Sequence, residues 1–89
     1  MATKIEFIQD GTKWACEMKP SASFVAQVQM ADKKDFTVYA FIEGMKPIAV
    51  FASNLYDNLI FKVDVPSGVT VRMVAYSEVL DAQMIDVEQ

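Results

Sequence analysis

The sequence predicts an all-β fold, a single antiparallel β-sandwich of seven or eight short strands. Apolar and polar residues alternate with a period of two along most of the chain, which is the pattern of half-buried strands. Turn signals separate these stretches at the short, regular spacing of sandwiches and barrels. Apolar residues make up 53 % of the 89 positions, so a small chain can still fill one dense core. We therefore expect residues 1–89 to form one domain.

The first two strands are expected on either side of a tight hairpin. Residues 3–9 alternate, with Ile5 and Phe7 on the inward face. Asp10-Gly11 follows, a dipeptide that favours a two-residue hairpin turn. The next strand ends near Pro20, which has no backbone donor for a ladder. Its predicted inward residues are Trp14, Cys16 and Met18.

Three strands follow in the centre of the chain. The inward face of the first, in residues 21–30, is Phe24, Ala26, Val28 and Met30. The second spans residues 35–43, with Phe36, Val38, Ala40 and Ile42 inward. A turn at residues 43–46 leads to the return strand from Pro47, where Ile48, Val50 and Ala52 are expected inward, with Ala49 and Phe51 outward.

The last third of the chain begins with a polar loop at residues 53–58. A strand at residues 59–65, a Pro-Ser-Gly turn and a strand at residues 69–77 come next. The acidic segment 78–89 is ambiguous, because Leu80, Ala82 and Met84 fit a strand whereas Leu80, Met84 and Val87 fit a helix. We favour a last strand near residues 83–88.

The stretch "VPSGVTVRMVAYSE", residues 65–78, resembles the late strands of immunoglobulin-like and fibronectin type III domains. A Pro/Gly turn there leads into an alternating strand that ends in a small residue and an aromatic one. This resemblance implies an immunoglobulin-like sandwich. The paired cysteines of true immunoglobulin domains are missing, and Val69 and Val71 stand near where fibronectin-like domains have a tyrosine.

The sequence lacks the residues that most enzyme and metal sites need. The absence of histidine removes His-dependent triads and His-ligated zinc sites. Cys16 is the single cysteine, so no intrachain disulfide can form. The three glycines each stand alone in a predicted turn and make no phosphate-binding loop. We therefore expect no catalytic residues, no metal and no cofactor.

The charge distribution narrows the range of partners. The net charge is −4, and all of the excess lies after residue 77. The bases are scattered, whereas nucleic-acid binding needs basic patches. The start "MATKIEF" lacks signal-peptide features, and no apolar run is long enough for a membrane helix. We expect cytoplasmic synthesis, with a virion or another assembly as a possible destination, and no direct contact with nucleic acid or membrane.

Large apolar groups are also expected on faces that should be wet. Tyr39 and Phe41 lie side by side opposite a complete core face, and Tyr76 ends a later strand. Leu55 and Tyr56 are expected at the tip of a polar loop. These five residues are the candidate protein-binding site, for another protein or for a second copy. The alternative is that loops or the C-terminal segment cover them.

Three functional hypotheses remain open. The first is a non-enzymatic, protein-binding structural or accessory module of a larger assembly, for example a virion decoration or cement protein. The second is a small acidic inhibitor that occupies a basic nucleic-acid or substrate channel of a target protein. Its acidic surface would be Glu78, Asp81, Asp86 and Glu88. The third, ranked last because 89 residues leave little spare volume, is a carrier of a small apolar ligand.

Overall fold

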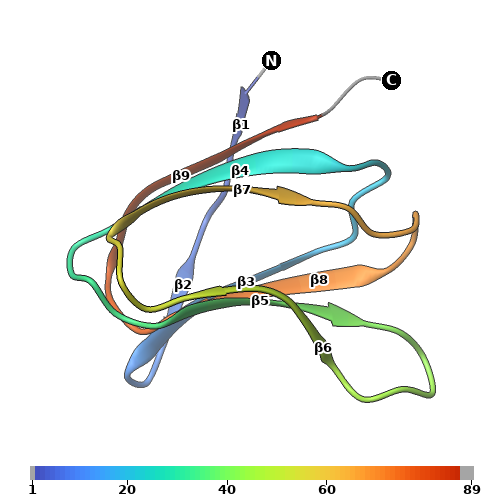
Figure 1. The fold of residues 1–89 in the computed structure, drawn as a ribbon, viewed down its shortest axis with the longest axis horizontal. Coiled ribbons are helices and arrows are strands. Elements are labelled where there is room, and N and C mark those ends of the chain that lie inside the picture. The colour runs from blue at the N-terminus through green and yellow to red at the C-terminus, as the bar shows by residue number, and fades with distance from the viewer. Residues whose placement is uncertain (1, 87–89) are drawn as a thin grey trace.

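The computed structural model describes residues 2–86 and forms nine strands in two antiparallel sheets, which confirms the predicted all-β sandwich (Figure 1). In chain order the strands are β1 (Ala2–Lys4), β2 (Ile8–Asp10), β3 (Lys13–Met18), β4 (Phe24–Met30), β5 (Phe36–Phe41), β6 (Ile48–Ser53), β7 (Asn58–Val63), β8 (Thr70–Ala75) and β9 (Val79–Asp86). Within this part of the chain, no helix is long and apolar enough to span a membrane.

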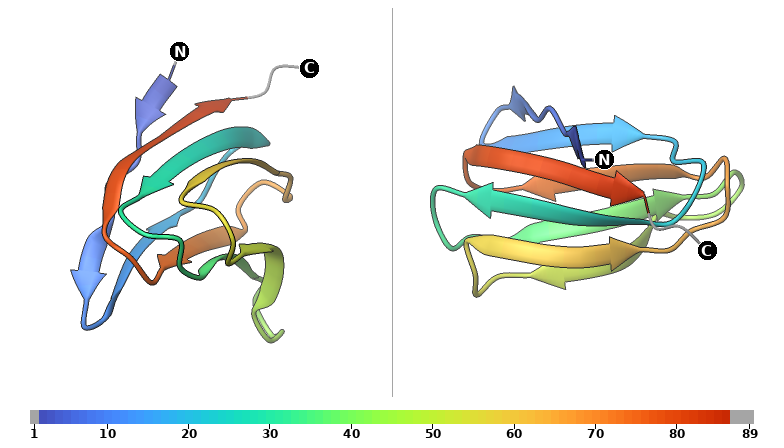
Figure 2. Two further views of the ribbon diagram at one scale, coloured as in Figure 1. Left: turned by 60° about the vertical axis from the view of Figure 1, so that its left-hand side comes forward. Right: turned by 90° about the horizontal axis from the view of Figure 1, so that it is seen from above.

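The strand order is that of a jelly roll. One sheet has the order β1-β9-β4-β7 and the other the order β2-β3-β8-β5-β6, and the two lie face to face as layers (Figure 2). If β1 and β2 count as halves of one strand, these orders become 1-8-3-6 and 1-2-7-4-5, so the second half of strand 1 extends the second sheet at its edge. Immunoglobulin constant domains place their last two strands side by side, whereas β8 and β9 lie in different sheets here. The immunoglobulin-like order is therefore not confirmed.

The predicted first strand is divided between the two sheets. β1 pairs with β9 in the four-stranded sheet, and β2 pairs with β3 in the five-stranded sheet. Between them Ile5 is buried, and its backbone N–H donates to the carbonyl oxygen of Ala82 at 2.9 Å. Phe7 packs against the core from the same segment. The inward assignment of both residues is confirmed, and the segment joins the sheets along one side of the sandwich.

Phenylalanine rings join the two layers of the core. Phe36 on β5 is fully buried, and its ring centroid lies 5.5 Å from that of Phe61 on β7. Phe51 on β6 stacks on Phe61 at 4.5 Å, and Phe7 approaches Phe36 at 6.4 Å. The predicted inward residues of β4 and those of β5 up to Ala40 are all buried. Of the inward residues predicted for the strand at 59–65, Leu59, Phe61 and Val63 are buried on β7, and Val65, beyond its end, is half-buried. Alternation therefore predicts the central part of both sheets correctly.

The predicted inward face of the return strand is wrong because β6 contains a β-bulge. Val38 lies opposite Phe51, but Tyr39 lies opposite Ala49, so Val50 is an extra residue in β6. The bulge exchanges the two faces beyond it: Phe51 packs into the core and Ala52 is exposed. Ile48 lies opposite inward-facing Ala40 but remains 41 % exposed, because this end of β6 bends away from the other layer (Figure 1).

The C-terminal segment is a strand, but it begins earlier than predicted. β9 starts at Val79 and pairs with β1 on one side and β4 on the other. Its register with β4 shifts at Leu80, which is an extra residue between Val79 and Asp81. Leu80, which shares the parity of Ala82 in the sequence, is therefore turned out and 58 % exposed. Val87 and Glu88 lie outside the described residues.

Two turns shape the ends of the five-stranded sheet. Asp10 pairs with Lys13 across a two-residue turn, and Gly11 at its first central position has φ +64°, the pattern of a type II′ hairpin. The second turn joins β5 to β6 through Gly44, with φ +81°. Ile42, predicted as part of the core, lies in this connection and is exposed. The correction follows from the end of β5 at Phe41.

Candidate functional site

The outer face of the five-stranded sheet carries the residues that the sequence analysis singled out. On this face Ala15, Val74 and Thr37 lie opposite one another on β3, β8 and β5. Because the side chains in this row are small, the outer surface of the sheet is recessed there. Val74 is only 6 % exposed, although it points away from the sandwich core. Larger neighbours on the same face must therefore cover its flanks.

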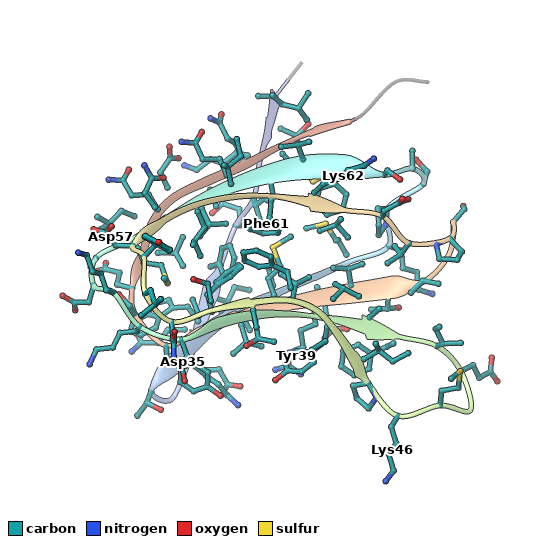
Figure 3. The ribbon with its side chains drawn as sticks, in the orientation of Figure 1. Asp35, Tyr39, Lys46, Asp57, Phe61 and Lys62 are labelled. Atoms are coloured by element: carbon teal, nitrogen blue, oxygen red, sulfur yellow. The ribbon has the colours of Figure 1, made fainter. Side chains whose placement is uncertain are left out.

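These neighbours form a shallow depression of about 200 Å³ around Val74. Pro47 lines it from the β5–β6 connection, and its other lining residues, which we call the aromatic face, are Lys13, Tyr39, Phe41, Arg72, Val74 and Tyr76. Tyr39 is half-buried, and Phe41 is 37 % exposed. Figure 3 shows Tyr39 on the side of β5 opposite to Phe61, which lies between the layers. The aromatic rings are thus held by the sheet while part of each surface stays open to solvent.

Positive charge lies beside the rings. Arg72 on β8 is opposite Tyr39 on β5 and opposite Glu17 on β3. Lys13 lines the same depression from the start of β3. Arginine and tyrosine are the residue types most enriched at protein interfaces, because both combine a broad flat surface with hydrogen-bond donors. The aromatic face offers both types next to a buried apolar floor.

The structure brings together three of the five predicted protein-binding residues. Tyr39, Phe41 and Tyr76 share the aromatic face. Tyr56 lies elsewhere, in a depression of about 500 Å³ between the edges of β6 and β7, beside Ile60. Leu55 is exposed in the adjoining loop and lines neither depression. The predicted contact surface of Tyr39 and Phe41 with Tyr56 is therefore not a single surface.

Sequence analysis missed the two basic residues of this face. Lys13 shares parity with Ala15 and Glu17, and Arg72 shares parity with Val74 and Tyr76. Parity alone placed both on outer faces, but the two strands are neighbours only in the folded sheet. The signal that could have found them is therefore the pairing of β3 with β8, which is not encoded by any short-range pattern.

The outer face of the four-stranded sheet has a different character. It is lined by amide and charged side chains, and the Gln83 side chain donates a hydrogen bond to that of Gln27 at 3.2 Å. Its exposed large apolar residues are Ile60 on β7 and Leu80 and Ile85 on β9, with β4 between the two strands. These side chains are aliphatic and are divided between two strands that do not pair, unlike the aromatic residues around Val74.

The predicted acidic surface is spread along the last strand. Glu78 and Asp81 are exposed, at the start of β9. Asp86 ends the strand, five residues beyond Asp81, a distance of about 17 Å in extended chain. Glu88 lies outside the described residues. The acids that the structure describes are therefore not gathered at one point.

Cys16 lies half-buried on the inward face of β3, beside half-buried Trp14 and Met18. The predicted side of these three residues is confirmed, although none is fully buried. Burial raises the pKa of the Cys16 thiol from 9.0 to about 11, a hydrogen bond with the Met73 backbone lowers it, and the Glu17 carboxylate raises it slightly. A thiol with this pKa is almost entirely protonated near neutral pH, which makes it a poor nucleophile.

Across residues 2–86, no group of three or more His, Cys, Asp or Glu side chains is placed to hold a metal ion. Comparisons with family models, curated proteins and solved structures found no match for this chain. The geometry and chemistry of the aromatic face are therefore the basis for assigning a function.

Proposed function

We propose that this protein is a non-enzymatic, protein-binding structural or accessory module, and that it binds its partner through the aromatic face. One observation carries the proposal. The rings of Tyr39 and Phe41 on β5 and of Tyr76, just after β8, line one depression with a buried valine on a sheet face that has no second layer, and two basic side chains line it too. Such a surface matches the centre of a protein interface better than an ordinary solvated sheet face.

The energetics of the face favour protein binding. Tyr39, Phe41 and Tyr76 would lose little rotamer freedom on docking, because an aromatic side chain has only two χ angles. Their open surfaces would supply apolar area, and the tyrosine hydroxyls and Arg72 would supply directed hydrogen bonds. Lys13 and Arg72 would favour a partner with acidic groups around its apolar contact.

The assembly in which such a module acts is part of the proposal. A decoration or cement protein of a virion is one example that suits a small sandwich with one docking face. Jelly rolls occur in capsid and lectin domains, which is a likeness of fold alone. The acidic-inhibitor alternative finds no specific support, because the described acids are spread along β9.

A comparative pull-down tests the proposal. The wild-type protein, a Tyr39→Ser/Phe41→Ser variant and an Ile60→Ser/Ile85→Ser control would each be immobilised and exposed to a lysate of the native source. The control removes two exposed apolar side chains from the opposite sheet. We expect the first variant to lose the wild-type partner and the control to retain it, with circular dichroism showing that both are folded. Retention by both variants would contradict the proposal.

A further inference from the structure

The connection between β5 and β6 forms an exposed arm, residues 42–47. Figures 1 and 2 show it bending away from the sandwich at one end of the five-stranded sheet. All residues from 41 to 50 are exposed, and Met45 near the tip is 60 % exposed. Glu43 and Lys46 lie on either side of Met45. The arm therefore carries one exposed apolar side chain with an acid and a base close to it in sequence.

The opposite end of the same sheet carries a matching row. Lys13 begins β3, Tyr76 follows β8 and Asp35 precedes β5, and we call these three residues the end row. The backbone N–H of Tyr76 donates to the carbonyl oxygen of Asp35 at 2.9 Å, so these two are neighbours across the strands. Lys13 and Tyr76 line the same depression. The end row therefore presents a base, an exposed aromatic ring and an acid.

The distance between the two charges of the arm is compatible with the distance between the two charges of the end row. Lys13 and Asp35 are separated by two strand spacings, about 10 Å. Glu43 and Lys46 are three residues apart, which limits them to about 11 Å. The turn that carries them is closed by a hydrogen bond from the Met45 N–H to the Ile42 carbonyl oxygen at 3.0 Å. The arm can thus place Glu43 near Lys13, Lys46 near Asp35 and Met45 over Tyr76, a favourable sulfur–aromatic contact.

The contact cannot form within one chain. β5 separates Asp35 from the arm, and its six residues span about 20 Å. Figure 3 shows Asp35 at one end of β5 and Lys46 at the tip of the arm beyond the other end. The complementary sets therefore lie at opposite ends of one sheet face. A two-fold axis that brings two such faces together would place each arm against the other copy's end row.

We infer that the partner of the aromatic face is a second copy of this chain, in a two-fold dimer in which each arm binds the end row of the other copy. This inference depends on the proposed docking role of the aromatic face and names its partner. The dimer would cover both aromatic faces, and it would contain each ionic contact twice.

A charge-reversal cycle measured by analytical ultracentrifugation tests the dimer. Asp35→Lys and Lys46→Glu each turn an attraction into a repulsion. An exposed ion pair changes affinity about 1.4- to fivefold, and each contact occurs twice, so each variant should weaken dimerisation about two- to twenty-five-fold. The variant carrying both changes restores opposite charges and should dimerise within about twofold of wild type. In one chain, Asp35 and the arm are separated by about 20 Å, which exceeds the Debye length of about 10 Å at 0.1 M salt. An attraction restored by the two changes together must therefore act between chains.

Matched controls identify the surface. Lys62→Glu and Asp81→Lys, alone and together, make the same charge changes on the opposite sheet and should leave dimerisation unchanged. Met45→Ser should weaken the dimer at least tenfold, because it removes an apolar side chain from both contacts. A wild-type protein that stays monomeric at millimolar concentration overturns the inference. So does a double reversal that is as weak as its two single changes combined. A monomer whose aromatic-face variant still loses its partner in the pull-down would leave the proposed function standing.

Discussion

The substitution Phe36→Ala should lower the free energy of unfolding of this protein by about 3–5 kcal/mol. Phe36 is fully buried and packs within 6.4 Å of three other aromatic rings, two of them on neighbouring strands or the facing sheet. Replacing a buried phenylalanine by alanine costs about 3–5 kcal/mol, because the cavity adds to the lost transfer free energy. A chain of 89 residues has a total stability of about 4–13 kcal/mol. The loss is therefore a large fraction of the whole.

Phe41→Ala provides the matched control on the outer face of the same strand. Phe41 is 37 % exposed, so about two thirds of the 1.5–3 kcal/mol for a fully buried side chain, or about 1–2 kcal/mol, should be lost. Urea unfolding followed by Trp14 fluorescence would measure the free energy of unfolding of both variants. The loss for Phe36→Ala should exceed that for Phe41→Ala by about 1–4 kcal/mol. Equal losses would refute the assignment of Phe36 to the core and Phe41 to the surface.

Three further predictions test local features. Gly11→Ala should cost about 1 kcal/mol in urea unfolding, because Gly11 has φ +64° but free space around it, and a neutral effect would contradict the turn assignment. Leu80→Asp should change the free energy of unfolding by less than about 0.5 kcal/mol, because Leu80 is exposed, whereas Ala82→Asp should prevent folding, because Ala82 is buried. The reverse result would exclude the bulge at Leu80. Cys16 should react slowly with a thiol reagent near neutral pH, and the reaction rate should rise as the pH approaches the Cys16 pKa of about 11. The free energy of unfolding should fall between about pH 9 and 11, because the Cys16 thiol ionises at a lower pH in the unfolded chain than in the folded one. A fast reaction of the native protein at pH 8 would contradict this.

The sequence predicts strands well where one face is continuously buried. β4 and β7 alternate along their whole length, and β5 alternates as far as Ala40. The inward residues of these three strands are all buried. A hairpin at this place could also be predicted from Gly11, because positive φ is a local property of glycine, but the two turn residues are Gly11 and Thr12 instead of Asp10 and Gly11. These features depend on residues that are close together in sequence.

The errors come from features that depend on pairing. The extra residues Val50 and Leu80 are both apolar, so each continues the hydrophobic pattern of its strand while pointing outward. Only the register with a partner strand reveals such a bulge. The change of sheet at Ile5 and the jelly-roll order are likewise long-range properties. Alternation fixes the face of a residue only until the next bulge.

The candidate site was half predictable for the same reason. Tyr39, Phe41 and Tyr76 could be found because each is an aromatic residue on an outward parity. Their meeting around Val74, and the addition of Lys13 and Arg72, required β3, β8 and β5 to be neighbours. Tyr56 fitted the compositional argument equally well, yet the β6–β7 connection places it in a different depression.

The central claim is that the protein binds its partner through the aromatic face. Hydroxyl-radical footprinting of the free protein and of its complex with that partner tests this most directly, because it reports which side chains become covered. The rate of oxidation of Tyr39, Phe41 and Tyr76 should fall on complex formation. Ile60, 74 % exposed on the other sheet, should be oxidised at an unchanged rate. Protection of Ile60 with unchanged oxidation of the three aromatic residues would contradict docking through the aromatic face.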